Sequence, residues 1–158
     1  MPLSETEQTL IGEIVERHAT DPGQLVQILR DVQQALRHIP ADAMDLLATL
    51  LGVDRSRVQA VAEFYTFFST EPRGRFDIRI SDSITDQMLG SREIADDLCR
   101  RLGIREGETR TDGRVSVQYT SCTGMCDQGP AALVNGYALT QLDRKRLTRI
   151  VELVEADL

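Results

Sequence analysis

The spacing of the apolar residues changes near residues 71–75, and this change constrains the fold more than any other feature. Before it, apolar side chains recur every three or four residues, as in the stripe from Leu25 to Leu36, whereas beyond it they alternate, as in Phe76–Ile80. The first pattern is typical of amphipathic helices and the second of strands. A turn-rich segment, Glu71–Arg75, separates the two patterns. We therefore predict two domains, residues 1–70 and 71–158.

The first domain is predicted to be a four-helix bundle. Its first helix opens at a capping box, Ser4–Glu7, and its third ends at Gly52, a residue suited to a helix C-terminus. The apolar stripes place the four helices at about residues 4–18, 21–39, 41–51 and 55–68. Both histidines, His18 and His38, are expected to cap or flank helices of this bundle.

The second domain is predicted to be an α/β layer with a mixed sheet, which makes the whole chain an α+β protein. Strands are expected at residues 76–80 and 114–119, and helices at 91–102 and from Asp143 onward. Asn135-Gly136 is the pair most favoured by a two-residue type I′ hairpin. We therefore expect the flanking segments 131–134 and 137–142 to pair as a hairpin.

Charge and composition exclude several classes of function. The 158 residues include 18 Lys and Arg against 25 Asp and Glu, for a net charge of −7. No basic face is left for nucleic acid, and no apolar run is long enough for a membrane span. Without a signal-peptide pattern, the chain is expected to be cytoplasmic, where its three cysteines are better suited to metal, redox or core roles than to disulfides. Cys99 lies on the apolar face of a predicted helix and is expected in the core.

The cysteine loop Cys122–Pro130 holds the chain's other two thiols. Cys122 and Cys126 are separated by three residues that include Gly124, in a segment too rich in glycine for a helix. A glycine with positive φ can turn backbone N–H groups inward around a soft metal centre. Because each iron of a 2Fe–2S cluster takes two protein ligands, this pair could satisfy one iron and not the other.

A second set of ligands is expected from the first loop, residues 81–91, which follows the strand 76–80. If the two strands that precede the loops are neighbours, the loops meet at one edge of the sheet. The first loop contains no cysteine. Oxygen ligands can bind ferric iron, but they are harder donors than thiolate.

The chain resembles a known family over nearly its whole length. The resemblance rests on the order and spacing of Ile39-Pro40, residues 61–68, Pro72-Arg73-Gly74, Gly90-Ser91 and the cysteine loop. The similar family is the thioredoxin-like 2Fe–2S subunit of NADH dehydrogenase, with its equivalents in soluble NAD-reducing hydrogenases and NAD-dependent formate dehydrogenases. The resemblance implies a helical bundle joined to a thioredoxin-like ferredoxin domain. It also implies docking on a partner subunit that binds FMN and NAD.

In the family four cysteines hold the cluster, and matching the first loop through Gly90-Ser91 places two of them at Ser81 and Asp86. The resemblance therefore implies a metal set of Cys122 and Cys126 with Ser81 and Asp86. One interpretation is an electron-transfer subunit with these unusual ligands, and the alternative is a structural subunit that has lost its cluster. A redox pair or a zinc site at the two cysteines is a third hypothesis. An independent enzyme is the least favoured, since no nucleophile with its base and no Gly-rich phosphate loop is present.

Overall fold

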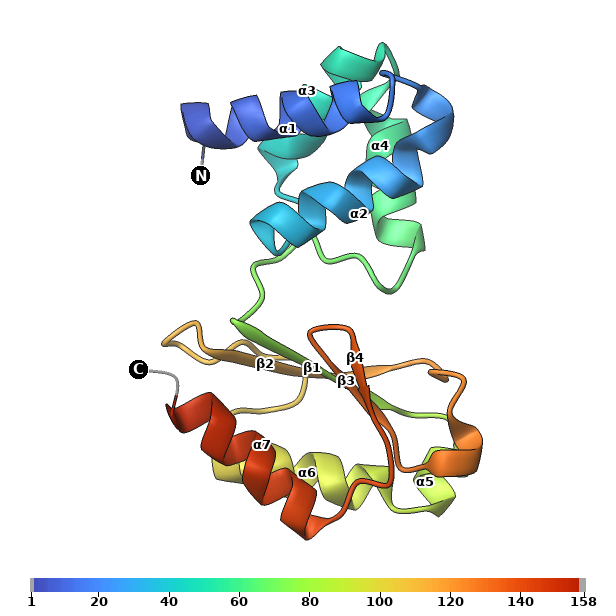
Figure 1. Cartoon of the computed structure of the whole chain (residues 1–158), viewed down its shortest axis with the longest axis vertical. Coiled ribbons are helices and arrows are strands. Elements are labelled where there is room, and N and C mark those ends of the chain that lie inside the picture. Colours follow the sequence, from blue (N-terminus) through green and yellow to red (C-terminus); the bar gives the residue numbers. More distant parts are fainter. Residues whose placement is uncertain (1, 157–158) are drawn as a thin grey trace. The chain divides into compact units, whose positions relative to one another are not determined.

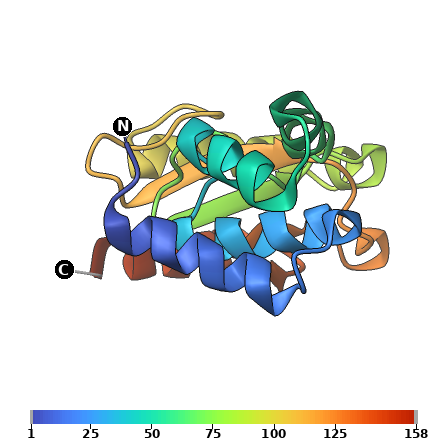
Figure 2. The same ribbon diagram turned by 90° about the horizontal axis from the view of Figure 1, so that it is seen from above.

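The computed structural model describes residues 2–156. Its contacts divide the chain between Pro72 and Arg73 into two compact units, which Figures 1 and 2 show from two directions. Each unit surrounds an apolar core of its own. No helix within the described residues is long and apolar enough to cross a membrane.

The first unit is helical. Its elements are α1 (Glu5–Arg17), the 3-10 turn η1 (Pro22–Gln24), α2 (Leu25–Leu36), α3 (Ala41–Leu51) and α4 (Arg55–Phe64). The predicted capping box is present, since the Ser4 hydroxyl accepts from the Glu7 N–H and the Glu7 carboxylate accepts from the Ser4 N–H. The core of this unit includes fully buried side chains from the helices and from the segment after α2: Ile11, Ile28, Leu29, Ile39 and Leu47.

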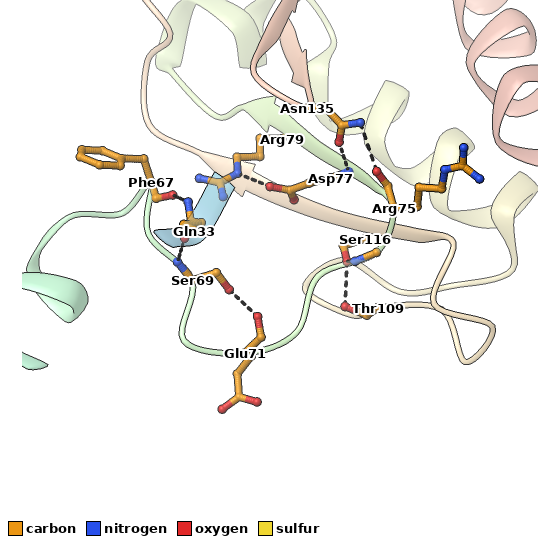
Figure 3. Close-up of polar contacts among 11 residues, drawn as sticks. Gln33, Phe67, Ser69, Glu71, Arg75, Asp77, Arg79, Thr109, Ser116 and Asn135 are labelled. Carbon is orange, nitrogen blue, oxygen red and sulfur yellow. Dashed lines mark hydrogen bonds and ion pairs between the residues drawn. The ribbon is translucent and has the colours of Figure 1, made fainter. Parts of the chain in front are cut away.

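Two helix predictions in this unit were wrong at their ends. The turn after Asp21 is a separate 3-10 turn rather than the start of α2, and α2 ends at Leu36 instead of Ile39. Helix α4 ends at Phe64 instead of Phe68. A long-range contact explains the end of α4. The side-chain amide of Gln33 donates to the Phe67 carbonyl at 2.8 Å and accepts from the Ser69 N–H at 2.6 Å (Figure 3). These bonds hold the segment after Phe64 against α2, so tertiary contacts override the helical pattern of the sequence.

Both histidines lie at helix ends in this unit, as predicted. His18 is the C-terminal cap of α1, with one ring nitrogen 2.9 Å from the Gln24 side-chain oxygen and the other 2.9 Å from the Asp31 carboxylate. Mainly because of the bond to Asp31, the pKa of His18 is raised. The Nδ1 of His38 lies 3.1 Å from the Leu36 carbonyl.

The second unit is a mixed sheet covered by helices. Its elements are β1 (Phe76–Ser81), α5 (Ile84–Met88), α6 (Ser91–Leu102), β2 (Val115–Thr120), the 3-10 turn η2 (Cys126–Gln128), β3 (Ala132–Val134), β4 (Tyr137–Leu139) and α7 (Arg144–Ala156). The strand order is β2-β1-β3-β4, with β1 and β2 parallel and the other pairs antiparallel. Helices α6 and α7 lie on the same face of the sheet (Figure 1).

The β3–β4 hairpin has the predicted turn but is shorter than predicted, because β4 ends at Leu139 instead of Leu142. Asn135 and Gly136 both have positive φ, of 50° and 84°, as a type I′ turn requires. The Asn135 side chain also accepts from the Asp77 N–H and donates to the Arg75 carbonyl, which ties the turn to β1 (Figure 3). The sequence analysis missed α5 in the first loop and η2 in the cysteine loop.

Candidate functional site

The parallel pairing of β1 and β2 brings the two candidate loops together. Ser81 is opposite Thr120 in the register, so both strands end at the same edge of the sheet. Beyond the strands, the Asp82 N–H donates to the Thr120 carbonyl at 2.9 Å, and the Ser81 N–H donates to the Ala131 carbonyl at 2.9 Å. The prediction that the two loops meet at one edge is confirmed.

The two loop cysteines lie side by side. Their Sγ atoms are 3.1 Å apart, and Gly124, with φ of 79°, directs its N–H to the Cys122 Sγ at 3.4 Å. Cys122 is exposed and Cys126 is half-buried. The bonds from the Cys126 thiol and the Gly124 N–H lower the pKa of Cys122, while sharing its proton with Cys122 raises the pKa of Cys126. The two thiols therefore titrate as one pair.

Asp86 is a buried polar hub between the two loops. Its side chain is 1% exposed, and one carboxylate oxygen accepts from the Ser81 hydroxyl at 2.6 Å and from the Ser83 hydroxyl at 2.7 Å. The other oxygen accepts from the Ala131 N–H, in the second loop, at 3.1 Å. Ser81 is itself fully buried. The two predicted oxygen ligands are thus brought together, but they bind each other and the backbone.

Ser83 is a residue of this site that the sequence analysis did not single out. Its hydroxyl accepts from the Asp86 N–H at 3.1 Å as the N-terminal cap of α5, and it lies 4.0 Å from the Cys126 Sγ. It is the side chain through which the Asp86 hub reaches the thiol pair. The Ser-x-x-Asp spacing of Ser83 and Asp86 is a helix-start signal that could have revealed this cap.

Gly129 lets the second loop pack directly against Asp86. A Cβ at this position would lie 2.5 Å from Asp86 Oδ1 and 2.8 Å from a methyl group of Leu89. Since the φ of Gly129 is −68°, the glycine is required for space and not for backbone conformation. The two loops therefore form one close-packed unit around the carboxylate.

Comparison with known proteins assigns the family. The model of the family described as "Thioredoxin-like [2Fe-2S] ferredoxin" matches residues 11–155, which cover most of both units. The chain belongs to this family. A relative from Rhizobium meliloti (strain 1021), one of the subunits of an NADH-quinone oxidoreductase, is 34% identical over 128 residues, covering 81% of this chain and 76% of the relative.

This chain is also similar to part of longer hydrogenase chains. The alpha subunit of the NAD-reducing hydrogenase HoxS from Cupriavidus necator is 33% identical over 141 residues, which are 89% of this chain and 23% of that subunit. The crystal structure of an air-oxidised NAD+-reducing [NiFe]-hydrogenase superimposes with a TM-score of 0.76 at 32% identity, covering 85% of this chain and 23% of that one. This chain therefore corresponds to about a quarter of the hydrogenase chains that it resembles.

The donor set of the site does not fit the 2Fe–2S cluster that the family's description names. Cys122 and Cys126 are suited to one iron, but the second iron would require Ser81 and Asp86, which are buried, hydrogen-bonded to each other and harder donors than thiolate. Among the described residues, no group of three or more His, Cys, Asp or Glu side chains is placed to hold a metal ion.

The third cysteine does not supply a missing ligand. Cys99 is buried in the core of the second unit, as predicted, and burial is the main cause that raises its pKa to about 11.

Proposed function

We propose that this chain is an accessory subunit of an NAD(H)-linked electron-transfer complex: a hydrogenase, a formate dehydrogenase or the diaphorase module of an NADH dehydrogenase. It docks on the partner subunit that binds FMN and NAD, and it acts in the cytoplasm. The observation that carries the proposal is the similarity of residues 11–155 to a family that includes subunits of such enzymes. We further propose that residues 1–70 are a four-helix bundle domain and that residues 71–158 are a thioredoxin-like domain.

An exposed apolar surface beside the site supports docking. Ile84, Met88 and Leu89, from α5 and the residue after it, are 78%, 83% and 49% exposed. Large apolar side chains gathered in water are typical of a surface that a partner covers. The α5 surface, defined by these three residues, belongs to the helix that also carries the buried Asp86. We propose that the flavin-binding subunit covers it.

Within the complex, the geometry favours a structural role for this subunit. A cluster with ligands in both loops would link them, whereas here the Asp86 carboxylate links them through Ser81, Ser83 and the Ala131 N–H. A carboxylate that accepts three hydrogen bonds inside the protein stabilises the loops without metal. The subunit then supports the flavin-binding partner, and electrons pass through other chains.

The second candidate is an electron carrier with a 2Fe–2S cluster on Cys122, Cys126, Ser81 and Asp86. The observation that favours it is the retained thiol pair, whose sulfurs are 3.1 Å apart in the family's loop. For this role the bond between Ser81 and Asp86 must break, and the serine must lose a proton whose pKa is far above neutral. The two candidates differ in iron content, so an assay of iron and acid-labile sulfide per chain distinguishes them.

Docking is tested by co-expressing the full chain, carrying an affinity tag, with the FMN- and NAD-binding subunit of its own organism. We expect the two to co-purify with bound FMN and with NADH-dependent reduction of ferricyanide. The double variant Ile84→Asp/Met88→Asp should lose the partner, whereas Leu153→Asp, which changes an exposed leucine of α7, should retain it. Failure of the unaltered chain to bind the flavoprotein would refute the proposal. Equal binding by both variants would show that the partner does not dock on the α5 surface.

A further inference from the structure

We propose that Cys122 and Cys126 form a reversible dithiol–disulfide couple that reacts with small-molecule disulfides. The inference concerns the two thiols alone and is independent of whether the chain docks on a flavoprotein. It follows from three observations: the sulfurs are close together, one of them is exposed, and the neighbouring side-chain oxygens are hydrogen-bonded to groups other than the thiols.

The two sulfurs are placed to form a bond. They lie 3.1 Å apart, and a disulfide bond is about 2.05 Å long, so closure requires an approach of about 1 Å. Gly124 lies between the two cysteines with φ of 79°, and an added Cβ there would meet nothing within 4 Å. The loop can therefore adjust by this amount without displacing a neighbour.

The groups around the thiols do not compete for them. The Ser83 hydroxyl lies 4.0 Å from the Cys126 Sγ, and it donates to Asp86. Asp86 in turn is committed to Ser81 and to the Ala131 N–H. Within residues 2–156 no third His, Cys, Asp or Glu side chain is placed to complete a metal site with the two cysteines. Two adjacent thiols without further ligands are a dithiol.

The exposure of the two cysteines sets the order of the reaction. Cys122 is exposed and Cys126 is half-buried, so the Cys122 thiolate attacks the incoming disulfide R–S–S–R. The products of this step are a mixed disulfide, Cys122–S–S–R, and one thiol RSH. The Cys126 thiolate then attacks the Cys122 sulfur, which breaks the mixed bond and releases the second RSH. Two protein thiols are oxidised, and one disulfide is reduced to two thiols, so electrons and protons balance.

Charge favours a substrate without negative charge. Asp127 is exposed and directly follows Cys126, and the chain carries a net charge of −7. An anionic disulfide is therefore repelled from the loop, whereas a neutral one is not. The neutral compound 2-hydroxyethyl disulfide is the appropriate probe.

The experiment uses the anaerobically purified full chain with Cys99→Ala, which removes the buried third thiol and leaves the loop unchanged. The chain is incubated with 2-hydroxyethyl disulfide, the remaining thiols are alkylated, and the product is identified by mass spectrometry. We expect an intramolecular disulfide that dithiothreitol reverses. Adding Cys126→Ser should trap a mixed disulfide on Cys122. Adding Cys122→Ser instead leaves Cys126 as the only thiol of the pair. Its mixed disulfide should form about tenfold more slowly than that of Cys122 in the Cys126→Ser variant, because Cys126 is half-buried. Circular dichroism checks that all variants are folded.

Three results would each overturn the proposal. The first is a stable mixed disulfide on the chain that retains both thiols, since it would mean that the two sulfurs cannot meet. The second is a disulfide formed only between two chains. The third is protection of both thiols in the purified chain by bound iron, so that they react only after a chelator removes it.

Discussion

Replacing Asp86 with alanine should destabilise the second unit, because this carboxylate is the acceptor that joins the two loops. The change leaves the buried Ser81 hydroxyl and the buried Ala131 N–H without an acceptor, at about 1–3 kcal/mol for each group. Part of this loss of stability is offset, because the variant no longer buries a charged carboxylate away from water. We expect a net loss of about 2–4 kcal/mol in the free energy of unfolding.

The assay is urea unfolding of the full chain followed by far-ultraviolet circular dichroism, with hydrogen exchange of the peptide that contains Ala131. In Asp86→Ala the Ala131 amide should lose protection along with the global stability. Asp86→Asn keeps one acceptor oxygen and should lose about half as much. The matched control is Asp127→Ala, an exposed aspartate of the cysteine loop, which should stay within about 0.5 kcal/mol of the unaltered chain. Equal stability of Asp86→Ala and Asp127→Ala would show that the Asp86 carboxylate does not join the two loops.

Three further predictions concern other parts of the molecule. The pKa of His18 is raised by its bond to Asp31, so its contribution to stability is complete below about pH 6.5 and is lost as the pH rises through the folded-state pKa. NMR titration of the imidazole should therefore give a pKa above the ordinary value. Because the pKa of Cys99 is about 11, only about one part in a thousand of this thiol is ionised at pH 8, and it should alkylate far more slowly than the loop thiols. Gly129→Ala should cost about 1–3 kcal/mol, measured by urea unfolding, because its Cβ would lie 2.5 Å from Asp86 Oδ1.

Each of these has its own control. Asp31→Asn should lower the His18 pKa toward that of a free imidazole, and an unchanged titration curve would show that the pair does not form. Denaturation should bring Cys99 to the reactivity of the other thiols, and equal rates in the folded chain would contradict its burial. Gly12→Ala, in a helix where nothing lies within 4 Å of the added Cβ, should leave stability unchanged or raised. A similar result for Gly129→Ala would disprove the close packing of the loops.

Local signals in the sequence predicted most of the fold. The capping box at Ser4, the cap at Gly52 and the Asn135-Gly136 turn each depend on contacts within a few residues, so the sequence contains the whole signal. The end of α4 could not be predicted in this way, because it depends on Gln33, which binds Phe67 and Ser69 from more than thirty residues away.

The site was predicted in position but not in chemistry. The strand pattern correctly indicated that the first loop lies beside the cysteine loop, and the resemblance drew attention to Ser81 and Asp86. Spacing alone could not tell whether their oxygens turn toward the thiols or toward each other. That choice depends on the Ala131 N–H and the Ser83 hydroxyl, which complete the acceptor shell of Asp86. Matching the first loop to the family's ligand positions shows which residues stand there. The hydrogen bonds of those residues decide whether their oxygens are available to bind metal.

If hydrogen bonding to Asp86 replaces metal ligation in the first loop, the chain holds no cluster. The most direct measurement is iron and acid-labile sulfide per chain after anaerobic reconstitution, with the EPR spectrum of the dithionite-reduced protein. The unaltered chain is compared with the double variant Ser81→Cys/Asp86→Cys, which restores four thiols. We predict no stoichiometric cluster in the unaltered chain, and one 2Fe–2S cluster with a rhombic EPR signal in the variant. A full cluster in the unaltered chain, lost on Cys122→Ala, would contradict the account and would identify the chain as an electron carrier with oxygen ligands.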